Sequence, residues 1–202
     1  MKHQILLAFL SLAFSGIAYA QTNWPNGQTV RVVVPFPGGA STLDSVVRTL
    51  NPEISKNLST PVIVDNRPGA GTVIGVDATA KATDGHTVGA VANSFTVNQT
   101  LVKNLPYNAS KDLQPVILMA KTANVLAVRP GLPVNNLKEL IAYAKKNPGK
   151  LSYGSFGNGT TAHFAGEMLK SQAGIFVVHI PYRGQGPALT DLLAGNIDMM
   201  FG

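Results

Sequence analysis

Short runs of consecutive apolar residues alternate along this chain with stretches in which apolar residues recur every three or four positions. Runs of the first kind are typical of buried strands, whereas the second spacing is typical of helices that bury one face. The pattern predicts strands over residues 31–35, 61–65, 87–91, 113–120, 124–128, 151–153, 176–180 and 197–201. It predicts helices over residues 42–56, 136–147, 160–173 and 187–194, and one more between the 66–71 loop and about Lys81. Pro52 is expected to kink or end the helix over residues 42–56.

This alternation of strands and helices indicates an α/β fold with mostly parallel sheets that carry helices on both faces. It is interrupted around residues 120–124, where we expect one α/β unit to end and a second to begin. In sheets of this kind, ligands bind at the carboxyl ends of the strands, where loops lead into the following helices.

The first twenty residues have the pattern of an export signal rather than of folded structure. Lys2 and His3 form a short positive region, residues 5–17 are mostly apolar, and Ala18-Tyr19-Ala20 matches an A-x-A cleavage site. A membrane anchor is the alternative, but the apolar run is short for crossing a bilayer and ends in small residues. We therefore expect cleavage after Ala20 and an exported, periplasmic protein.

The composition excludes several classes of protein. With 45% hydrophobic and 13% charged residues, the chain can bury a core and is not a disordered polypeptide. Its net charge of +6 is spread thinly, and no basic cluster exceeds Lys145-Lys146, so we expect no nucleic-acid partner. The chain has no cysteine, and no two of its four histidines have H-x-x-x-H spacing. We therefore expect neither thiol chemistry nor a metal site.

Three predicted loops share an unusual composition at the ends of strands. Residues 35–42, 92–98 and 154–163 are rich in Gly, Ser, Thr and Asn and nearly devoid of charge. Glycines let backbone N–H groups approach a ligand closely, and a helix that begins after such a loop offers unpaired N–H groups to an anion. Loops of this kind can hold a carboxylate without lysine or arginine.

Each of these features also has a purely structural interpretation. Glycine-rich turns between strands and helices are common, and Thr160 or Thr161 could serve only as a helix N-cap. His163 could pair with Glu167 one helical turn later, on an exposed face. Asp44 is better explained as a carboxylate in the first turn of a helix than as a ligand-binding group.

Enzyme motifs are absent from the sequence. The segment GAGTVIG does not match the dinucleotide-binding G-x-G-x-x-G pattern, and the chain lacks a phosphate-binding G-x-x-x-x-G-K loop. Ser155 lies in GSFG rather than in the G-x-S-x-G of a nucleophile elbow. With no nucleophile–base pair and no arranged carboxylate pair in view, we expect a protein that is not an enzyme and needs no cofactor.

Five motifs in order carry a resemblance to a known family: PFPGG, VIVDNRPGAG, TDGHTV, YGSFGNGTTAHFAGEML and HIPYRGQGPALTDLLAGNIDMMF. Together they resemble the Bug family, the periplasmic solute-binding proteins of tripartite tricarboxylate transporters, over residues 25–202. The resemblance implies a two-lobed α/β fold of the type II periplasmic-binding-protein class. It also implies that two glycine loops from opposite lobes line the ligand cleft, with the Asn93-Ser94 loop and the turn at residues 181–184 contributing. The implied ligand-binding residues are Gly38, Gly39, Ala40, Ser41, Thr42, Asn93, Ser94, Gly157, Thr160, Thr161, Ala162, His163 and Tyr182.

The function implied by the resemblance is the capture of a small carboxylate or related organic acid, which a monomeric protein presents to membrane transporter subunits. We expect residues 1–20 to form the signal peptide, 21–121 the first lobe and 122–202 the second lobe. Family members usually run well past this length, so we expect a C-terminally truncated chain with an incomplete second lobe. Three alternatives stay open: a ligand-dependent co-sensor for a membrane signalling receptor, a periplasmic enzyme, and a truncated product without function.

Overall fold

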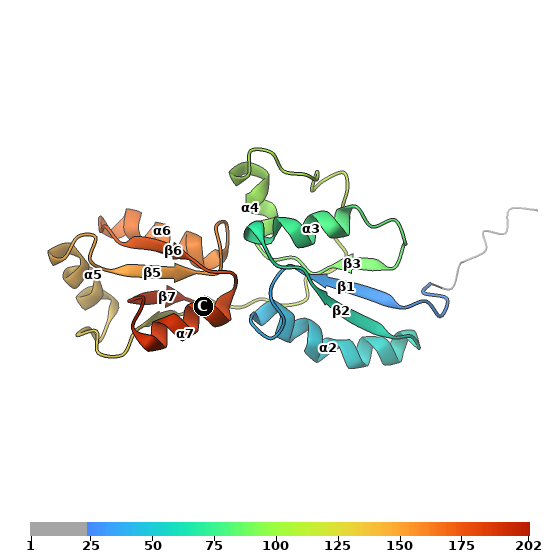
Figure 1. Cartoon of the computed structure of the whole chain (residues 1–202), viewed down its shortest axis with the longest axis horizontal. Helices are drawn as coiled ribbons and strands as arrows, with labels where there is room; N and C mark the ends of the chain where they lie inside the picture. The colour runs from blue at the N-terminus through green and yellow to red at the C-terminus, as the bar shows by residue number, and fades with distance from the viewer. Residues whose placement is uncertain (1–23) are drawn as a thin grey trace, which may run out of the picture.

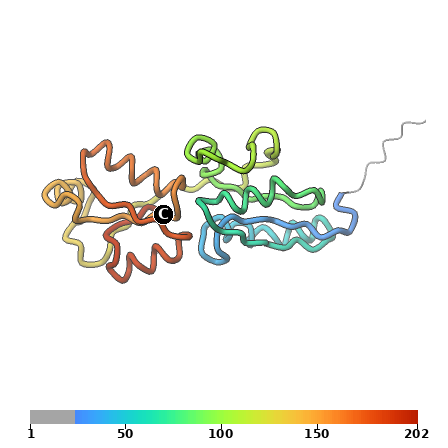
Figure 2. Tube along the Cα trace, turned by 45° about the horizontal axis from the view of Figure 1, so that its top comes forward, coloured from blue at the N-terminus to red at the C-terminus, as the bar shows by residue number. Residues whose placement is uncertain are grey.

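The computed structural model describes residues 24–202, which form two α/β lobes lying side by side (Figures 1 and 2). The predicted signal peptide and its cleavage site lie outside the described residues. Each lobe has a separate sheet with helices on both faces, which confirms the predicted fold class of mostly parallel α/β units. No helix within residues 24–202 is both long and apolar enough to cross a membrane.

The first lobe is built on a fully parallel sheet of three strands in the order β2-β1-β3. Its helices cover the two faces, with α2 on one face and α3 and α4 on the other (Figure 1). The strands are β1 (Val30–Val34), β2 (Val62–Asn66) and β3 (Thr87–Gly89). The helices are α2 (Thr42–Leu58), the 3₁₀ turn η1 (Ala70–Thr72), α3 (Val73–Ala80) and α4 (Ser94–Leu101).

The second lobe has a four-stranded sheet in the order β4-β7-β5-β6, in which only β4 runs antiparallel to its neighbour. Helices α6 and α7 contact β5 and β7 from opposite faces (Figure 1). The strands are β4 (Leu126–Val128), β5 (Ser152–Ser155), β6 (Val178–Pro181) and β7 (Met199–Phe201). The helices are α5 (Leu137–Lys146), α6 (Thr161–Ala173) and α7 (Gln185–Ala194).

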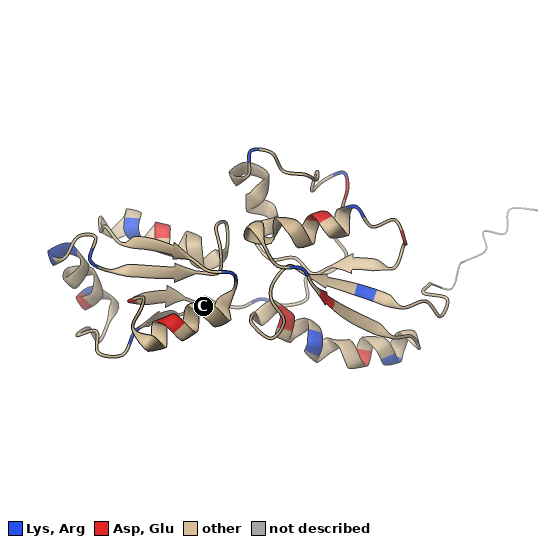
Figure 3. Ribbon diagram, viewed as in Figure 1, with Lys and Arg blue, Asp and Glu red and all other residues tan. Residues whose placement is uncertain are grey.

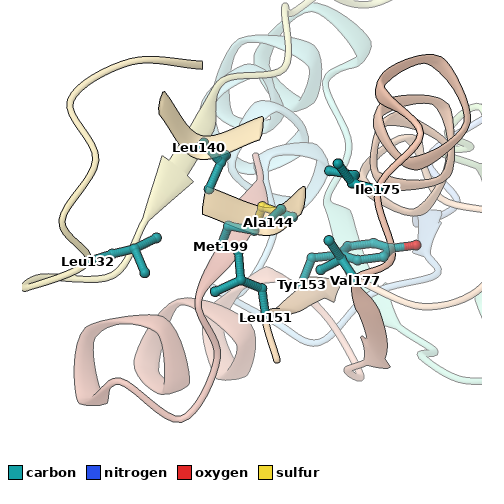
Figure 4. Close-up of a cluster of buried hydrophobic side chains, with 8 residues drawn as sticks. All are labelled: Leu132, Leu140, Ala144, Leu151, Tyr153, Ile175, Val177 and Met199. Carbon is teal, nitrogen blue, oxygen red and sulfur yellow. The ribbon is translucent and has the colours of Figure 1, made fainter. Parts of the chain in front are cut away.

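The core of the second lobe lies between this sheet and its helices. Figure 4 shows its buried side chains, namely Leu132, Leu140, Ala144, Leu151, Tyr153, Ile175, Val177 and Met199. Tyr153 is completely buried, and its hydroxyl donates to the Glu167 carboxylate at 2.7 Å. The hydroxyl of a buried tyrosine needs such a partner, so this bond helps to fix how α6 lies on β5.

Three predictions differ from the structure. Residues 113–120 do not form a strand, because none of the described segments lies beside them to complete a hydrogen-bonded ladder; Val116 is 86% exposed. Helix α4 occupies most of the predicted 92–98 loop, and α2 continues through Pro52 to Leu58 instead of ending there. The chain passes from the first sheet to the second between α4 and β4. The division at residues 121 and 122 stays a prediction.

Candidate functional site

The two lobes enclose a small cavity where they meet. Its walls are the segments that directly follow β1, β2, β5 and β6, so both sheets present the carboxyl ends of parallel strands to it. The cavity has a volume of about 50 Å³. Its lining residues are Pro35, Phe36, Pro37, Pro68, Gly69, Ala70, Gly71 and Thr72 from the first lobe, and Phe156, Gly157, Tyr182 and Arg183 from the second.

A buried carboxylate holds the first glycine loop in place. Asp44 is completely buried, and its Oδ2 accepts hydrogen bonds from the Gly39 backbone N–H at 2.7 Å and from Arg48 Nε at 2.8 Å. Its Oδ1 accepts from Asn66 Nδ2 at 2.7 Å, and the same amide nitrogen donates to the Phe36 carbonyl. Asp44 therefore ties the loop after β1 to the end of β2, a role that its place in the first turn of α2 did not reveal.

The Asp44 environment also sets its ionisation. Burial raises the pKa of this carboxyl, but hydrogen bonds from Arg48, Asn66 and Gly39 lower it further than burial raises it. The pKa therefore lies below the ordinary value of 3.8, and the group is ionised at neutral pH. A charged acceptor makes stronger hydrogen bonds than a neutral one, which suits an anchor for a flexible glycine loop.

The loop after β2 has a strained backbone facing the cavity. Ala70, Gly71 and Thr72 have φ angles of 47°, 60° and 81°, respectively. Thr72 is β-branched, and such residues rarely adopt positive φ, so the surrounding structure must compensate for the strain. Thr72 Oγ1 lies 2.8 Å from Ser94 Oγ, and Asn98 Nδ2 donates to the Gly71 carbonyl at 2.9 Å. Helix α4 thus holds this loop from behind.

Side chains from its own lobe hold the glycine loop after β5. The Gly157 N–H donates to Ser155 Oγ at 3.2 Å, and Thr160 Oγ1 donates to the Gly157 carbonyl at 2.7 Å. The Gly159 N–H donates to His163 Nδ1 at 3.2 Å. Thr160 occupies the N-cap position of α6, but its hydroxyl makes no capping bond, because it closes the loop instead.

Two histidines stack behind this loop. The rings of His163 and His179 have centroids 4.6 Å apart, and His179 Nε2 is hydrogen-bonded to Ser155 Oγ at 2.7 Å. Burial, together with the neighbouring His163, lowers the pKa of His179 below 6.5. His163 does not bond to Glu167, which accepts instead from the Tyr153 hydroxyl and from Lys170 Nζ, each at 2.7 Å. Among residues 24–202, no group of acidic and histidine side chains is arranged to hold a metal ion.

The lobes contact each other at their glycine loops. The N–H groups of Gln185 and Gly186, at the start of α7, donate to the Ala40 carbonyl of the first lobe at 3.1 and 3.3 Å. A Cβ added to Gly71 would lie 2.7 Å from the Asn158 carbonyl oxygen of the second lobe. No side chain fits at that point, so the lobes can approach this closely only with glycine there.

The predicted site residues divide into those in the cavity wall and those behind it. Gly157 and Tyr182 line the cavity, whereas residues 38–42 continue the loop that lines it at Pro37. Residues 160–163 surround the start of α6, and Asn93 and Ser94 that of α4, with Ser94 buried against Thr72. Which of these residues touch a ligand stays a prediction. The loop at residues 68–72 was missed, although the Pro-Gly-Ala-Gly sequence after a predicted strand could have indicated it.

Comparison with known proteins places this chain in a family. Residues 46–202 match the family model of the tripartite tricarboxylate transporter family receptor. Protein BugT of Bordetella pertussis is 38% identical to this chain over 98% of the length of this chain. The structure is similar to Rpa4515 of R. palustris with adipate, with a TM-score of 0.83, 31% identity and 88% of this chain covered. It is also similar to MatC of Rhodopseudomonas palustris with bound malate, with a TM-score of 0.78, 31% identity and 86% covered.

The chain spans only part of these relatives, namely 61% of BugT, 60% of Rpa4515 and 59% of MatC. The family match covers the second lobe and the first lobe from residue 46 onward, so it includes the cavity-lining residues after β2, β5 and β6 but not β1 or the loop that follows it. The family is one of receptors, and its solved members include a periplasmic binding protein, BugD, which agrees with the expectation of a binding protein rather than an enzyme. The chain therefore belongs to the tripartite tricarboxylate transporter receptor family, as the motifs of its sequence predicted.

Proposed function

We propose that this protein is a periplasmic receptor that binds a small carboxylate between its lobes and presents it to the membrane subunits of a transporter. One observation carries the proposal: loops from both lobes, each at the carboxyl end of a strand, together enclose one cavity. The adipate and malate complexes of its structural relatives support a carboxylate as the ligand. The signal-like N-terminus and the similarity to a periplasmic binding protein, BugD, support export to the periplasm.

The cavity explains how binding would be coupled to closure. Its volume of about 50 Å³ is well below the roughly 300–1,000 Å³ of ordinary small-molecule pockets. The lobes must therefore separate to admit a ligand, and a ligand that contacts both of them stabilises the form in which they meet. The membrane partner would then distinguish the occupied protein from the empty one by the position of its lobes. No covalent chemistry is required.

A thermal unfolding screen against small mono- and dicarboxylates tests this proposal. A ligand present at about a hundred times its Kd adds about 2.7 kcal/mol of stability, which raises the Tm of a chain of this size by about 5 to 10 °C. We expect such a rise with at least one carboxylate and none with neutral amides of the same length. If no carboxylate raises the Tm, the proposal is wrong.

A matched pair of glycine substitutions locates the ligand between the lobes. Gly71→Ala places a Cβ against the Asn158 carbonyl of the opposite lobe, so the lobes cannot close and the ligand-induced rise in Tm should disappear. Gly85→Ala is the control, because Gly85 has a similar φ of 67° and no heavy atom within 4 Å of an added Cβ. Equal ligand responses from the two variants would contradict binding between the lobes.

A further inference from the structure

The loop between β5 and α6 carries the second lobe's contact with the first lobe beside the cavity. A Cβ added to Gly159 would lie 2.9 Å from Asn98 Oδ1, on α4 of the first lobe. The carbonyl of the preceding residue, Asn158, lies against Gly71 of the first lobe, and Gly157 lines the cavity. The position of this loop therefore decides how closely the two lobes meet.

One histidine holds this loop through a nitrogen that must stay unprotonated. Gly159 is buried, and its N–H donates to His163 Nδ1 at 3.2 Å. A backbone N–H can only donate, so Nδ1 is the acceptor and the proton of the neutral ring lies on Nε2. Protonation of Nδ1 would turn it into a donor that faces another donor. The bond to Gly159 therefore exists only while His163 is neutral.

The second histidine is not restricted in this way. His179 Nε2 lies 2.7 Å from Ser155 Oγ, and a hydroxyl can either donate or accept. Ser155 can therefore bond to His179 in both protonation states and still accept from the Gly157 N–H. A proton on His179 leaves the bonds of the loop in place, whereas a proton on His163 breaks one of them.

The charges around the two rings largely cancel. Within residues 24–202, the ionisable groups that face the rings are Tyr153 on β5 and Glu167 and Lys170 on α6. Glu167 and Lys170 pair with each other at 2.7 Å. Burial raises the pKa of the Tyr153 hydroxyl, so this group stays neutral. Helix α4, the first-lobe element against the loop, carries no ionisable residue. Loss of the bond to Gly159 is therefore the main effect of a proton on His163.

We propose that His163 is a positioning residue that makes ligand binding depend on pH, because its neutral ring holds the loop in the closed form and its protonation releases the loop. This inference rests on the proposed function and adds a regulation of the same site. In the closed form the Gly159 N–H is buried and has no other partner to take, whereas in the open form water can replace His163. Histidine side chains change charge between pH 5 and 8. Acidification in this range therefore favours the open form and weakens binding.

Calorimetric titration at pH 8 and pH 5.5 tests the proposal, with adipate, malate and any other acid that raises the Tm in the screen above. We expect binding to be about 10-fold weaker at pH 5.5, the cost of one buried donor without an acceptor. His163→Asn offers a neutral amide oxygen as the acceptor, so it should bind as the unmodified protein does at pH 8 and lose little affinity at pH 5.5. Any loss that remains in this variant measures protonation of the acids themselves.

Two further variants separate this role from a purely structural one. His163→Phe keeps an aromatic ring but has no acceptor, so it should bind about 10-fold more weakly already at pH 8 and respond little to pH. His86→Gln is the matched control. His86 directly precedes β3, at the end of the first sheet opposite the cavity, and its ring bonds to the carbonyls of Asp84 and Pro25. This variant should keep the full pH dependence.

The outcomes distinguish this inference from the proposed function. If the unmodified protein binds an acid equally well at both pH values, or if His163→Asn keeps the full pH dependence, the inference is wrong and the proposed function stands. If none of the acids binds at pH 8, the proposed function fails and this inference fails with it. NMR of the ligand-free, unmodified protein adds a test without variants. The Gly159 amide resonance should shift with the same midpoint as the His163 ring, and an amide that does not respond would overturn the inference.

Discussion

Replacing Asp44 by asparagine should be one of the most destabilising changes of a polar residue in this protein. Asparagine keeps the size of the side chain but exchanges one carboxylate oxygen for an NH₂ group. Oδ1 accepts from Asn66, and Oδ2 accepts from Gly39 and Arg48, so the new NH₂ group faces a donor in either orientation. Water cannot relieve this conflict, because the Asp44 side chain is completely buried.

The expected loss follows from these contacts. A hydrogen bond to a charged group contributes about 1.5–3 kcal/mol, but the share of Arg48 must be discounted, because its side chain is 50% exposed and screened by solvent. Asparagine keeps one oxygen, so one of the two remaining bonds is lost and the other weakens from a charged to a neutral one. Together these changes give a loss of about 3 kcal/mol in the free energy of unfolding, or a fall in Tm of about 6 to 12 °C. The loop at Gly39 would lose its anchor at the same time, so ligand affinity should fall as well.

Urea unfolding at pH 7 measures the loss, with Glu53→Gln as the control. Glu53 lies on the same helix and pairs with Lys56 at 3.7 Å, but both side chains are well exposed, so this change should cost less than about 0.5 kcal/mol. The pKa of Asp44 is lowered in the folded state, so its ionisation stabilises the fold above pH 3.8 and loses that effect as pH falls through the folded pKa. The difference between the unmodified protein and Asp44→Asn should therefore shrink below about pH 4. Equal stabilities at pH 7 would refute the role given to Asp44.

Three further changes test other parts of the structure. Burial lowers the pKa of His179 in the folded protein, so the unfolded chain is protonated at a higher pH than the folded chain. The free energy of unfolding should therefore fall as pH drops from 6.5 through the folded pKa. His179→Gln should flatten this slope in urea unfolding measured between pH 7.5 and 5. Tyr182→Phe removes the 2.7 Å bond to Asp191 and should lower the urea midpoint in the same assay, whereas an unchanged midpoint would exclude that contribution. Gly166→Ala improves helix propensity by about 1 kcal/mol, but its methyl group would overlap the buried Tyr153 ring. We therefore expect a Tm several degrees below that of the unmodified protein. A higher Tm would show that helix propensity outweighs the overlap.

Much of the local structure is a property of the sequence alone. The apolar run before the first glycine loop became β1, and the helical spacing over residues 42–56 became α2, because burial of one face selects the period of the backbone. The glycine loops that end β1 and β5 were also evident, since glycine after a strand marks a turn into the next helix. The family followed from the order of such motifs.

Pairing between distant segments could not be predicted in this way. Residues 113–120 have the composition of a strand but form none, since a strand exists only where another strand completes its hydrogen bonds. The strained turn at Ala70, Gly71 and Thr72 likewise depends on α4, which holds it from behind.

The character of the candidate site was decided by tertiary structure. Asp44 became an anchor because Asn66, 22 positions away, lies beside it, and Ser155 met His179 from 24 positions away. Sequence determines which groups a loop carries, but whether a charge is paired, buried or left facing a cavity depends on neighbours that only the folded chain brings together.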